Sequence, residues 1–258
     1  MSLPGSFTPD TLLVSSVLPS PNHGPRAEGR RPDLIILHYT GMVDADTAIA
    51  RLRSQVSEVS AHYVVEETGR IVQLVPEARR AWHAGDSSWE GGRDVNSRSI
   101  GIEIVNGGHD FGDPDFPQRQ VEAVIALAGD IVARYGIRAD RVLGHSDVAP
   151  GRKRDPGEKF PWDELHRAGV GHFVPPAPLR SGPALKPGDE NDGVKALQQL
   201  LSYYGYGVAI TGIYDDETEA VVAAFQRHFR PEHIDGIADL SSLKTLRDLI
   251  AARPRAAD

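Results

Sequence analysis

The stretch from Leu34 to Tyr39 limits the possible folds most, because its first four residues are all apolar and branched. A short continuous apolar run of this kind is typical of a strand that is buried on both faces. Side chains alternate along a strand, so His38 points to the same face as Leu34 and Ile36. The sequence therefore predicts a buried central strand with a histidine near its end.

Further strands and helices alternate along the chain up to about residue 173. We expect a hairpin from residues 61–65 and 71–75, and strands at 99–105 and 141–144. A helix is predicted after residue 45, with Asp46 as its N-cap, and another over 121–135, with Gly136 as its C-cap. This alternation predicts an α/β fold in which helices flank a mixed central sheet.

The residue pattern of the sequence changes after residue 173. Residues 174–188 contain five prolines, which is typical of a linker. Beyond them, three amphipathic stripes recur at helical spacing, and Ser241 or Ser242 is the expected N-cap of the third. Short helices of this kind must pack together to bury their apolar faces. We therefore predict an α/β domain over 1–173, a linker over 174–188 and a small three-helix domain over 189–258.

Charge and composition exclude several classes of function. The formal net charge of −8 argues against non-specific binding to nucleic acid, which needs clustered Lys and Arg. The chain has no cysteine, which excludes disulfides, thiolate metal ligands and a cysteine nucleophile. No run approaches the ~18 apolar residues of a membrane span. No leader is visible, so we expect a cytoplasmic protein, with the periplasm as the alternative if a leader precedes this sequence.

Three of the ten histidines stand out by position. His38 ends the apolar strand, His83 lies in the segment Ala-Trp-His-Ala-Gly, and His145 follows a short strand. Five others are expected to be solvated in loops or on helix surfaces: His109, His166, His172, His228 and His233.

We expect a long polar loop after the strand at 141–144, which begins near His145 and ends in Asp155-Pro-Gly. A segment with so little apolar content usually holds polar groups for a functional site. Two imidazoles and one carboxylate would give zinc three protein ligands and leave a fourth position for water, as in hydrolytic sites. The zinc-protease pattern His-Glu-x-x-His and the serine-hydrolase pattern Gly-x-Ser-x-Gly are both absent.

Four motifs in this order resemble the N-acetylmuramoyl-L-alanine amidases of the AmpD/AmiD type, the type 2 amidases related to phage T7 lysozyme and the peptidoglycan recognition proteins. They are Leu-His-Tyr-Thr at 37–40, Ala-Trp-His-Ala-Gly at 81–85, Ser-Ile-Gly-Ile-Glu-Ile at 99–104, and the segment 145–157. The resemblance covers about 34–162. Residues 203–206 and 223–231 are similar to the helical peptidoglycan-binding-like domain that follows the catalytic domain in part of this family.

The resemblance implies a role for each matching residue. It implies Zn²⁺ held by His38, His145 and Asp155, with Glu103 and Lys153 as the catalytic residues. It also suggests Trp82, His83 and Asn106 as substrate-binding residues, and His62 as a residue that supports the zinc site from behind. Alternation along residues 99–104 independently separates Glu103 and Gly101 from the isoleucine face.

The implied reaction is hydrolysis of the amide between N-acetylmuramic acid, or its 1,6-anhydro form, and L-alanine of the stem peptide. Its implied setting is cell-wall turnover or recycling, with peptidoglycan or anhydro-muropeptides as the partners and a monomeric enzyme. Two alternatives stay open at this point: a noncatalytic peptidoglycan-recognition protein, and a phage endolysin. Noncatalytic relatives typically lack a zinc ligand or a catalytic group, whereas all five positions are filled here.

Overall fold

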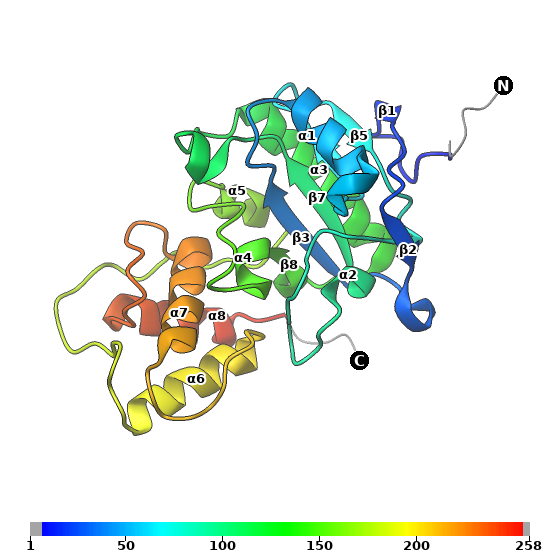
Figure 1. Ribbon diagram of the computed structural model, residues 1–258. Helices are drawn as coiled ribbons and strands as arrows, with labels where there is room; N and C mark the ends of the chain where they lie inside the picture. Colours follow the sequence, from blue (N-terminus) through cyan, green and yellow to red (C-terminus); the bar gives the residue numbers. More distant parts are fainter. Residues whose placement is uncertain (1–6, 255–258) are drawn as a thin grey trace.

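A six-stranded sheet forms the centre of the molecule, as the computed structural model of residues 7–254 shows (Figure 1). The strand order is β1-β5-β4-β7-β3-β8, and every neighbouring pair is parallel except β4 and β5. A small antiparallel pair, β2 and β6, lies beside it. The strands are β1 (Ser16–Val17), β2 (His23–Pro25), β3 (Leu34–Tyr39), β4 (Tyr63–Val65), β5 (Ile71–Gln73), β6 (Arg79–Ala81), β7 (Ser99–Ile104) and β8 (Val142–Gly144).

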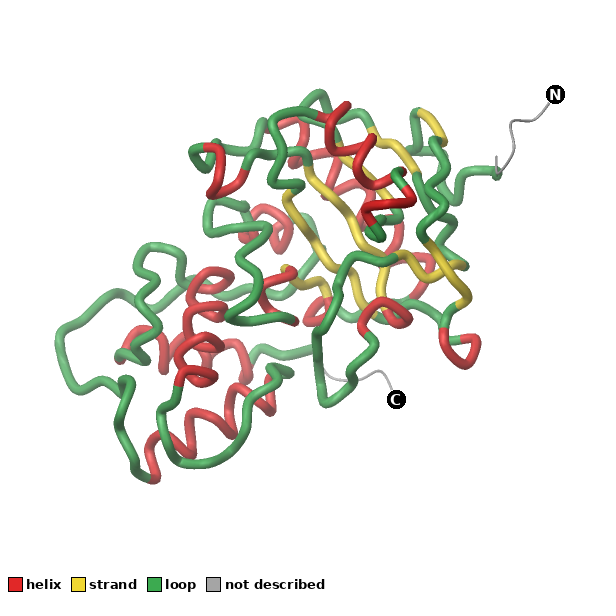
Figure 2. Tube along the Cα trace, viewed as in Figure 1, coloured by secondary structure: helices red, strands yellow, loops and turns green. Residues whose placement is uncertain are grey.

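The predicted α/β class with a mixed central sheet is confirmed, and helices cover both faces of that sheet (Figures 1 and 2). The α-helices are α1 (Ala45–Arg53), α2 (Val95–Arg98), α3 (Gln118–Tyr135), α4 (His145–Val148), α5 (Trp162–Arg167), α6 (Asp192–Tyr204), α7 (Asp216–Phe229) and α8 (Leu240–Ala251). Short 3-10 turns occur at η1 (Ala27–Gly29), η2 (Gln55–Ser57), η3 (Gly108–Phe111) and η4 (Ala139–Arg141). In the described residues, no helix combines the length and the apolar character needed to cross a bilayer.

The two faces of β3 are buried against different partners. Ile35 and Leu37 pack with β7, α3 and α5 on one face. Leu34 and Ile36 face the other way and share a core with α6, α7 and α8. This burial on both faces explains the continuous apolar run in the sequence. His38 follows the parity of Leu34 and Ile36, as predicted.

The three C-terminal helices pack directly on the α/β part of the chain. Trp89, from the loop before α2, is fully buried and makes edge contacts with Tyr204 and Tyr206. Gly205 permits this approach, because a Cβ there would lie 2.4 Å from the indole ring. The Glu90 N–H also donates to the Gly205 carbonyl at 2.8 Å. The domain boundaries themselves stay a prediction, but the helices share one hydrophobic core with the sheet.

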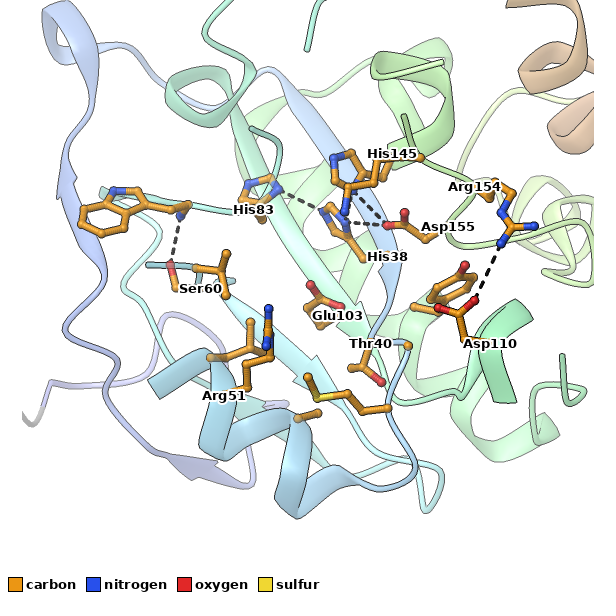
Figure 3. A pocket seen from close by; sticks show the side chains of 18 of the residues that line it. His38, Thr40, Arg51, Ser60, His83, Glu103, Asp110, His145, Arg154 and Asp155 are labelled. Carbon is orange, nitrogen blue, oxygen red and sulfur yellow. Dashed lines mark hydrogen bonds and ion pairs between the residues drawn. The ribbon is translucent and has the colours of Figure 1, made fainter. Parts of the chain in front are cut away.

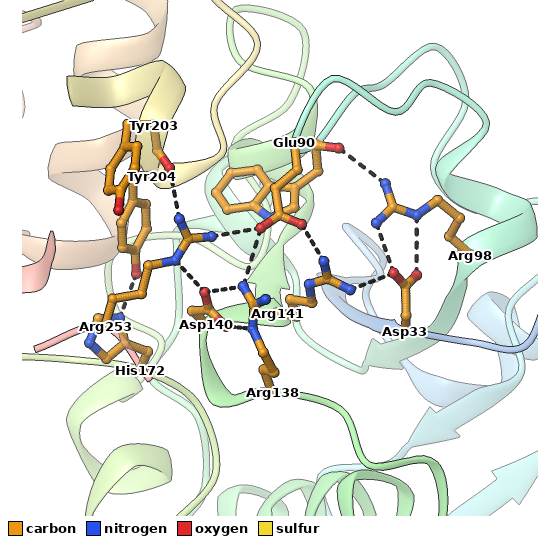
Figure 4. A network of polar contacts seen from close by, with 11 residues as sticks. Asp33, Glu90, Arg98, Arg138, Asp140, Arg141, His172, Tyr203, Tyr204 and Arg253 are labelled. Carbon is orange, nitrogen blue, oxygen red and sulfur yellow. Dashed lines mark hydrogen bonds and ion pairs between the residues drawn. The ribbon is translucent and has the colours of Figure 1, made fainter. Parts of the chain in front are cut away.

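An ionic network joins the end of the chain to the sheet edge (Figure 4). Arg253 donates to Asp140 at 2.5 Å and to Glu90 at 2.6 Å. Asp140 is fully buried and also accepts from Arg138 at 2.7 Å. Glu90 accepts from Arg141 at 2.6 Å. The network therefore connects residues that follow α8 with the loop before α2 and with η4.

Several local expectations need correction. Asp44, not Asp46, caps α1: its carboxylate accepts from the Thr47 N–H at 2.7 Å, whereas Asp46 lies in the first turn. Asp239 caps α8 in the same way, while both expected serines are inside the helix and buried. Serine and aspartate can both cap a helix, so residue type alone does not show which of several nearby candidates is the N-cap.

Candidate active site

A pocket of about 520 Å³ opens where β3 and β7 end, between α1 and the segment that follows α4 (Figure 3). Parallel strands end together, so their last side chains meet at one edge of the sheet. The pocket is lined by His38, Tyr39, Thr40, Gly41, Met42, Ala48, Arg51, Leu52, Val59, Ser60, Trp82, His83, Glu103, Asp110, His145, Arg152, Lys153, Arg154 and Asp155.

His38, His145 and Asp155 come together at the inner wall of this pocket, and all three are buried. The Nδ1 atoms of the two histidines are 3.0 Å apart. Asp155 Oδ2 lies 2.9 Å from Nδ1 of His38 and 3.0 Å from Nδ1 of His145. Three potential ligand atoms therefore form one tight triangle.

The hydrogen-bond partners behind His38 assign its tautomer. The Ser99 hydroxyl donates its single proton to the Val95 carbonyl at 2.7 Å, so it accepts from His83 Nε2–H at 3.2 Å. His83 Nδ1 is then an acceptor, and it receives the His38 Nε2–H at 3.0 Å. Burial and His145 lower the pKa of His38 to about 4, which keeps this ring neutral. The lone pair of His38 Nδ1 is therefore directed into the triangle.

His145 is held in the same tautomer by a simpler contact. Its Nε2–H donates to the Ala84 carbonyl at 3.0 Å, which leaves the Nδ1 lone pair facing His38 and Asp155. Arg152 donates to the same carbonyl at 2.7 Å. Three electron-rich atoms thus face one another with no proton assigned between the two nitrogens. Two histidine nitrogens and a carboxylate oxygen are the donor set of a hydrolytic zinc centre, and the residues present fit Zn²⁺.

Burial alone would raise the pKa of Asp155, but His145 and His38 hold it well below its ordinary range. The carboxylate is therefore ionised, as a metal ligand must be.

Glu103 lies beside His38 because β3 and β7 run parallel with these two residues in register. Its Oε2 atom is buried and has no hydrogen-bond partner among the described residues. Burial, followed by the Asp155 charge, raises the pKa of Glu103 to about 8, against a smaller lowering effect of Lys153. A buried carboxyl group that is left unpaired beside a pocket is typical of a functional group rather than of the core.

The other expected site residues divide into two groups. Lys153, Trp82 and His83 line the pocket together with Glu103, although His83 also lies behind His38. Asn106 is not among the lining residues; its amide donates to the Pro114 carbonyl and accepts from the Gly108 N–H. These two hydrogen bonds fix the loop after β7.

His62 does not contact any of the three candidate ligands through a hydrogen bond in the described structure. Its Nδ1 accepts from the Gly101 N–H at 3.0 Å, so its Nε2–H donates to the Arg79 carbonyl at 3.0 Å. It therefore fixes the backbone of β7 two residues before Glu103. The direct hydrogen bond with a candidate ligand is made by His83, whose ring has its centroid 5.8 Å from that of His62.

Two of the five histidines that were expected to be solvated are in fact buried: His172 and His228. His228 Nδ1 donates to Asp147 Oδ2 at 2.7 Å, and its ring stacks on Trp162. A signal for this burial was present, because His228 continues the apolar stripe of Val221, Ala224 and Phe225 on α7.

Comparison with known families agrees with this geometry. The family model described as N-acetylmuramoyl-L-alanine amidase matches residues 28–158, and a model for a peptidoglycan binding domain matches residues 190–246. The first match contains all three candidate ligands together with Glu103 and Lys153.

Individual proteins are similar over most of the chain. The N-acetylmuramoyl-L-alanine amidase AmiD of Escherichia coli is 38% identical over 221 residues, which cover 81% of this chain and 79% of that protein. The 1,6-anhydro-N-acetylmuramyl-L-alanine amidase AmpD of Enterobacter cloacae is 34% identical and covers 60% of this chain and 90% of its own length.

Solved structures give the same result. AmiD of E. coli in complex with the substrate anhydro-N-acetylmuramic acid-L-Ala-D-gamma-Glu-L-Lys superimposes with a TM-score of 0.73 at 36% identity, covering 88% of this chain and 91% of that one. AmpDh3 of Pseudomonas aeruginosa in complex with anhydromuramic pentapeptide gives a TM-score of 0.70 at 33% identity, covering 86% and 92%.

Proposed function

The chain belongs to the N-acetylmuramoyl-L-alanine amidase family, and from this membership we propose that it is a zinc-dependent amidase of peptidoglycan recycling. The scissile bond is the amide between 1,6-anhydro-N-acetylmuramic acid and the L-alanine of a stem peptide. The observation that carries the zinc part of the proposal is the triangle of His38 Nδ1, His145 Nδ1 and Asp155 Oδ2, whose tautomers direct both nitrogen lone pairs inward.

Five side chains of the pocket have a defined task in this reaction: the three ligands, Glu103 and Lys153. Zn²⁺ held by the three ligands would polarise the amide carbonyl and make water nucleophilic near neutral pH. Glu103 accepts the proton of the attacking water and then delivers it to the departing amine of L-alanine. The Lys153 ammonium group stabilises the negative charge that develops on the carbonyl oxygen during attack. A bound cation also lowers the pKa of the adjacent Glu103, which favours its role as a base.

The choice of an anhydro-muropeptide as substrate rests on two observations. Both solved complexes quoted above contain an anhydromuramic peptide. In addition, the pocket wall is rich in cationic groups, from Arg51 on α1 and from Arg152 to Arg154 beside the ligands. Such groups pair well with the carboxylates of a stem peptide.

Metal analysis of the purified protein tests the zinc assignment. We expect one Zn²⁺ per chain, loss of activity with a chelator, and recovery on addition of zinc. The double variant His145→Ala/Asp155→Ala should contain no stoichiometric zinc. Full zinc occupancy in that variant would show that the ligand assignment is wrong.

Replacement of Glu103 tests the division of labour. Glu103→Gln should retain zinc but lose roughly 10²-fold or more in kcat, the usual contribution of a general acid or base. Glu66→Gln, on the β4–β5 hairpin, is the control and should behave as the wild type. Near-normal turnover with Glu103→Gln would show that this residue does not act as a general acid or base.

A further inference from the structure

The C-terminal helices contact the segment that supplies two of the three candidate metal ligands. Asp147 lies on α4, two residues after His145, and is completely buried. Its Oδ1 accepts from the Tyr206 hydroxyl at 2.7 Å, and its Oδ2 accepts from His228 Nδ1 at 2.7 Å. Both donors belong to the helical part of the chain, Tyr206 just after α6 and His228 on α7.

We propose that Tyr206 and His228 are positioning residues for the metal centre, which they reach through Asp147. The C-terminal helices then help to build the active site, in addition to any binding of peptidoglycan. This inference rests on the proposed function, because it assumes that His145 and Asp155 bind zinc.

Helix α4 needs such support because it is only four residues long. An isolated helical turn of that length is unstable, since nucleation costs more than one turn of hydrogen bonds returns. Asp147 Oδ2 holds the start of this turn by accepting from the Gly144 N–H at 2.8 Å. The two donors from the C-terminal helices fix the same carboxylate, and through it the backbone from which His145 projects.

The other ligand is tied to the same turn. The Ser146 N–H donates to the carbonyl of Asp155 at 2.9 Å, so a shift of α4 also moves the backbone of Asp155. On the opposite side, the ring of His228 stacks on Trp162 with centroids 3.7 Å apart. Gly144 lies between Trp162 and the residue after Asp155, because a Cβ there would lie 3.3 Å from Trp162 and 2.8 Å from Pro156. The residue before His145 is therefore packed against the side chain on which His228 stacks.

The buried charge of Asp147 also favours a positioning role for the C-terminal helices over a role in glycan binding alone. A helical module that only carries the amidase to glycan has no need of a buried contact with the metal segment. Without the helices, the Asp147 carboxylate would keep the Gly144 N–H but lose two strong donors. A buried charge that loses its partners destabilises the segment that holds it.

A pair of single-hydroxyl deletions tests the inference in the full-length chain. Tyr206→Phe removes one donor to Asp147. Tyr214→Phe is the matched control, because its buried hydroxyl donates to the Gly236 carbonyl at 2.6 Å and stays within the helical part. Chelator competition gives the zinc dissociation constant, and thermal unfolding of the zinc-free proteins gives the stability of each variant.

Tyr206→Phe should raise the zinc dissociation constant about tenfold, the lower end of the effect of residues that orient metal ligands. Its kcat should fall more than its KM changes. Tyr214→Phe should lose similar stability yet bind zinc as the wild type does. Equal zinc affinity in the two variants would overturn the inference. A wild-type chain that binds no zinc would overturn the proposed function, and this inference with it.

Replacements of His228 give a second, independent comparison. His228→Asn retains a donor near the position of Nδ1, whereas His228→Ala removes it. We expect His228→Asn to recover most of the zinc affinity that His228→Ala loses. If both variants bind zinc with the affinity of the wild type, His228 has no positioning role.

Discussion

His83 lines the pocket, and it also lies behind His38 and shares a hydrogen bond with it. It accepts the Nε2–H of His38, and Ser99 in turn accepts the Nε2–H of His83. A metal-binding histidine generally needs such an acceptor behind it, which fixes the ring and increases its basicity. The chain from Ser99 through His83 to His38 therefore sets up the ligand before any metal binds.

Removal of this acceptor should weaken metal binding. We expect His83→Leu to raise the zinc dissociation constant about 10- to 100-fold, since His38 loses the group that selects its tautomer. His233→Leu is the control, because His233 is exposed and contacts Asp235 within the helical part. Zinc titration against a competing chelator measures both. Unchanged affinity in His83→Leu would show that the tautomer of His38 is set elsewhere.

At this scale, sequence reasoning succeeded where a residue belongs to a motif and was weaker where its partner is distant in sequence. The positions of His38, His145 and Asp155 follow from the family motifs, and the structure brings these residues together. The contacts of His83 and His62 depend on which backbone groups lie beside them after folding. No local pattern encodes that information, so the hydrogen bond from His38 to His83 could not be predicted from the sequence.

At the scale of secondary structure, the predicted elements are found with small shifts at their ends. Apolar periodicity predicts α3, α6, α7 and α8 well, because each of these helices buries one apolar face in the folded protein. The N-cap residues were less predictable, because a stretch such as Asp44-Ala-Asp46 offers two carboxylates that could each cap the helix. Helix α4 was expected to be part of a loop, since its four residues have no periodicity to detect and it depends on Asp147 and its distant partners.

The attachment of α8 to the sheet should depend on Arg253. Arg253→Ala removes donors from Asp140, which is buried, and from Glu90. We expect a loss of about 2 kcal/mol in the free energy of unfolding, as for a buried charged hydrogen bond. Lys244→Ala is the control, because its exposed pair with Asp248 should contribute less than about 1 kcal/mol. Urea unfolding measures both, and equal losses would mean that Arg253, in the network of Figure 4, stabilises the fold no more than an exposed ion pair does.

At the scale of the whole molecule, one buried histidine between the amidase part and the C-terminal helices is expected to make stability depend on pH. His172 lies between them, with Nδ1 2.8 Å from the Tyr204 hydroxyl. Burial lowers its pKa to about 4. The unfolded chain, with an ordinary histidine pKa near 6.5, therefore binds more protons than the folded chain between about pH 6.5 and pH 4.

Stability should consequently fall as the pH is lowered through that window. The contribution of His172 is fully present above about pH 6.5 and is lost progressively towards pH 4. His172→Gln cannot be protonated, so the fall between pH 7.5 and pH 5 should be smaller in this variant than in the wild type. Urea unfolding at the two pH values measures the difference. Identical pH dependence in the two proteins would show that His172 does not titrate differently on unfolding.

The packing of the C-terminal helices was not predictable from the sequence. The proline-rich segment 174–188 indicated a linker, and a linker suggests two parts that move independently. In the structure, Leu34 and Ile36 share a hydrophobic core with the helices, and Asp147 accepts a hydrogen bond from Tyr206. The helices are therefore packed against the sheet. Apolar stripes on short helices indicate that they must be covered, but they do not identify the covering surface.

Mass spectrometry of the products tests the central claim most directly. Zinc-free protein and protein restored with one equivalent of Zn²⁺ are each incubated with an anhydro-N-acetylmuramyl tripeptide. The account predicts that only the restored protein releases free anhydro-N-acetylmuramic acid and an intact peptide that begins with L-alanine, and that Glu103→Gln releases almost none. Cleavage at any other bond, or equal cleavage without zinc, would contradict it.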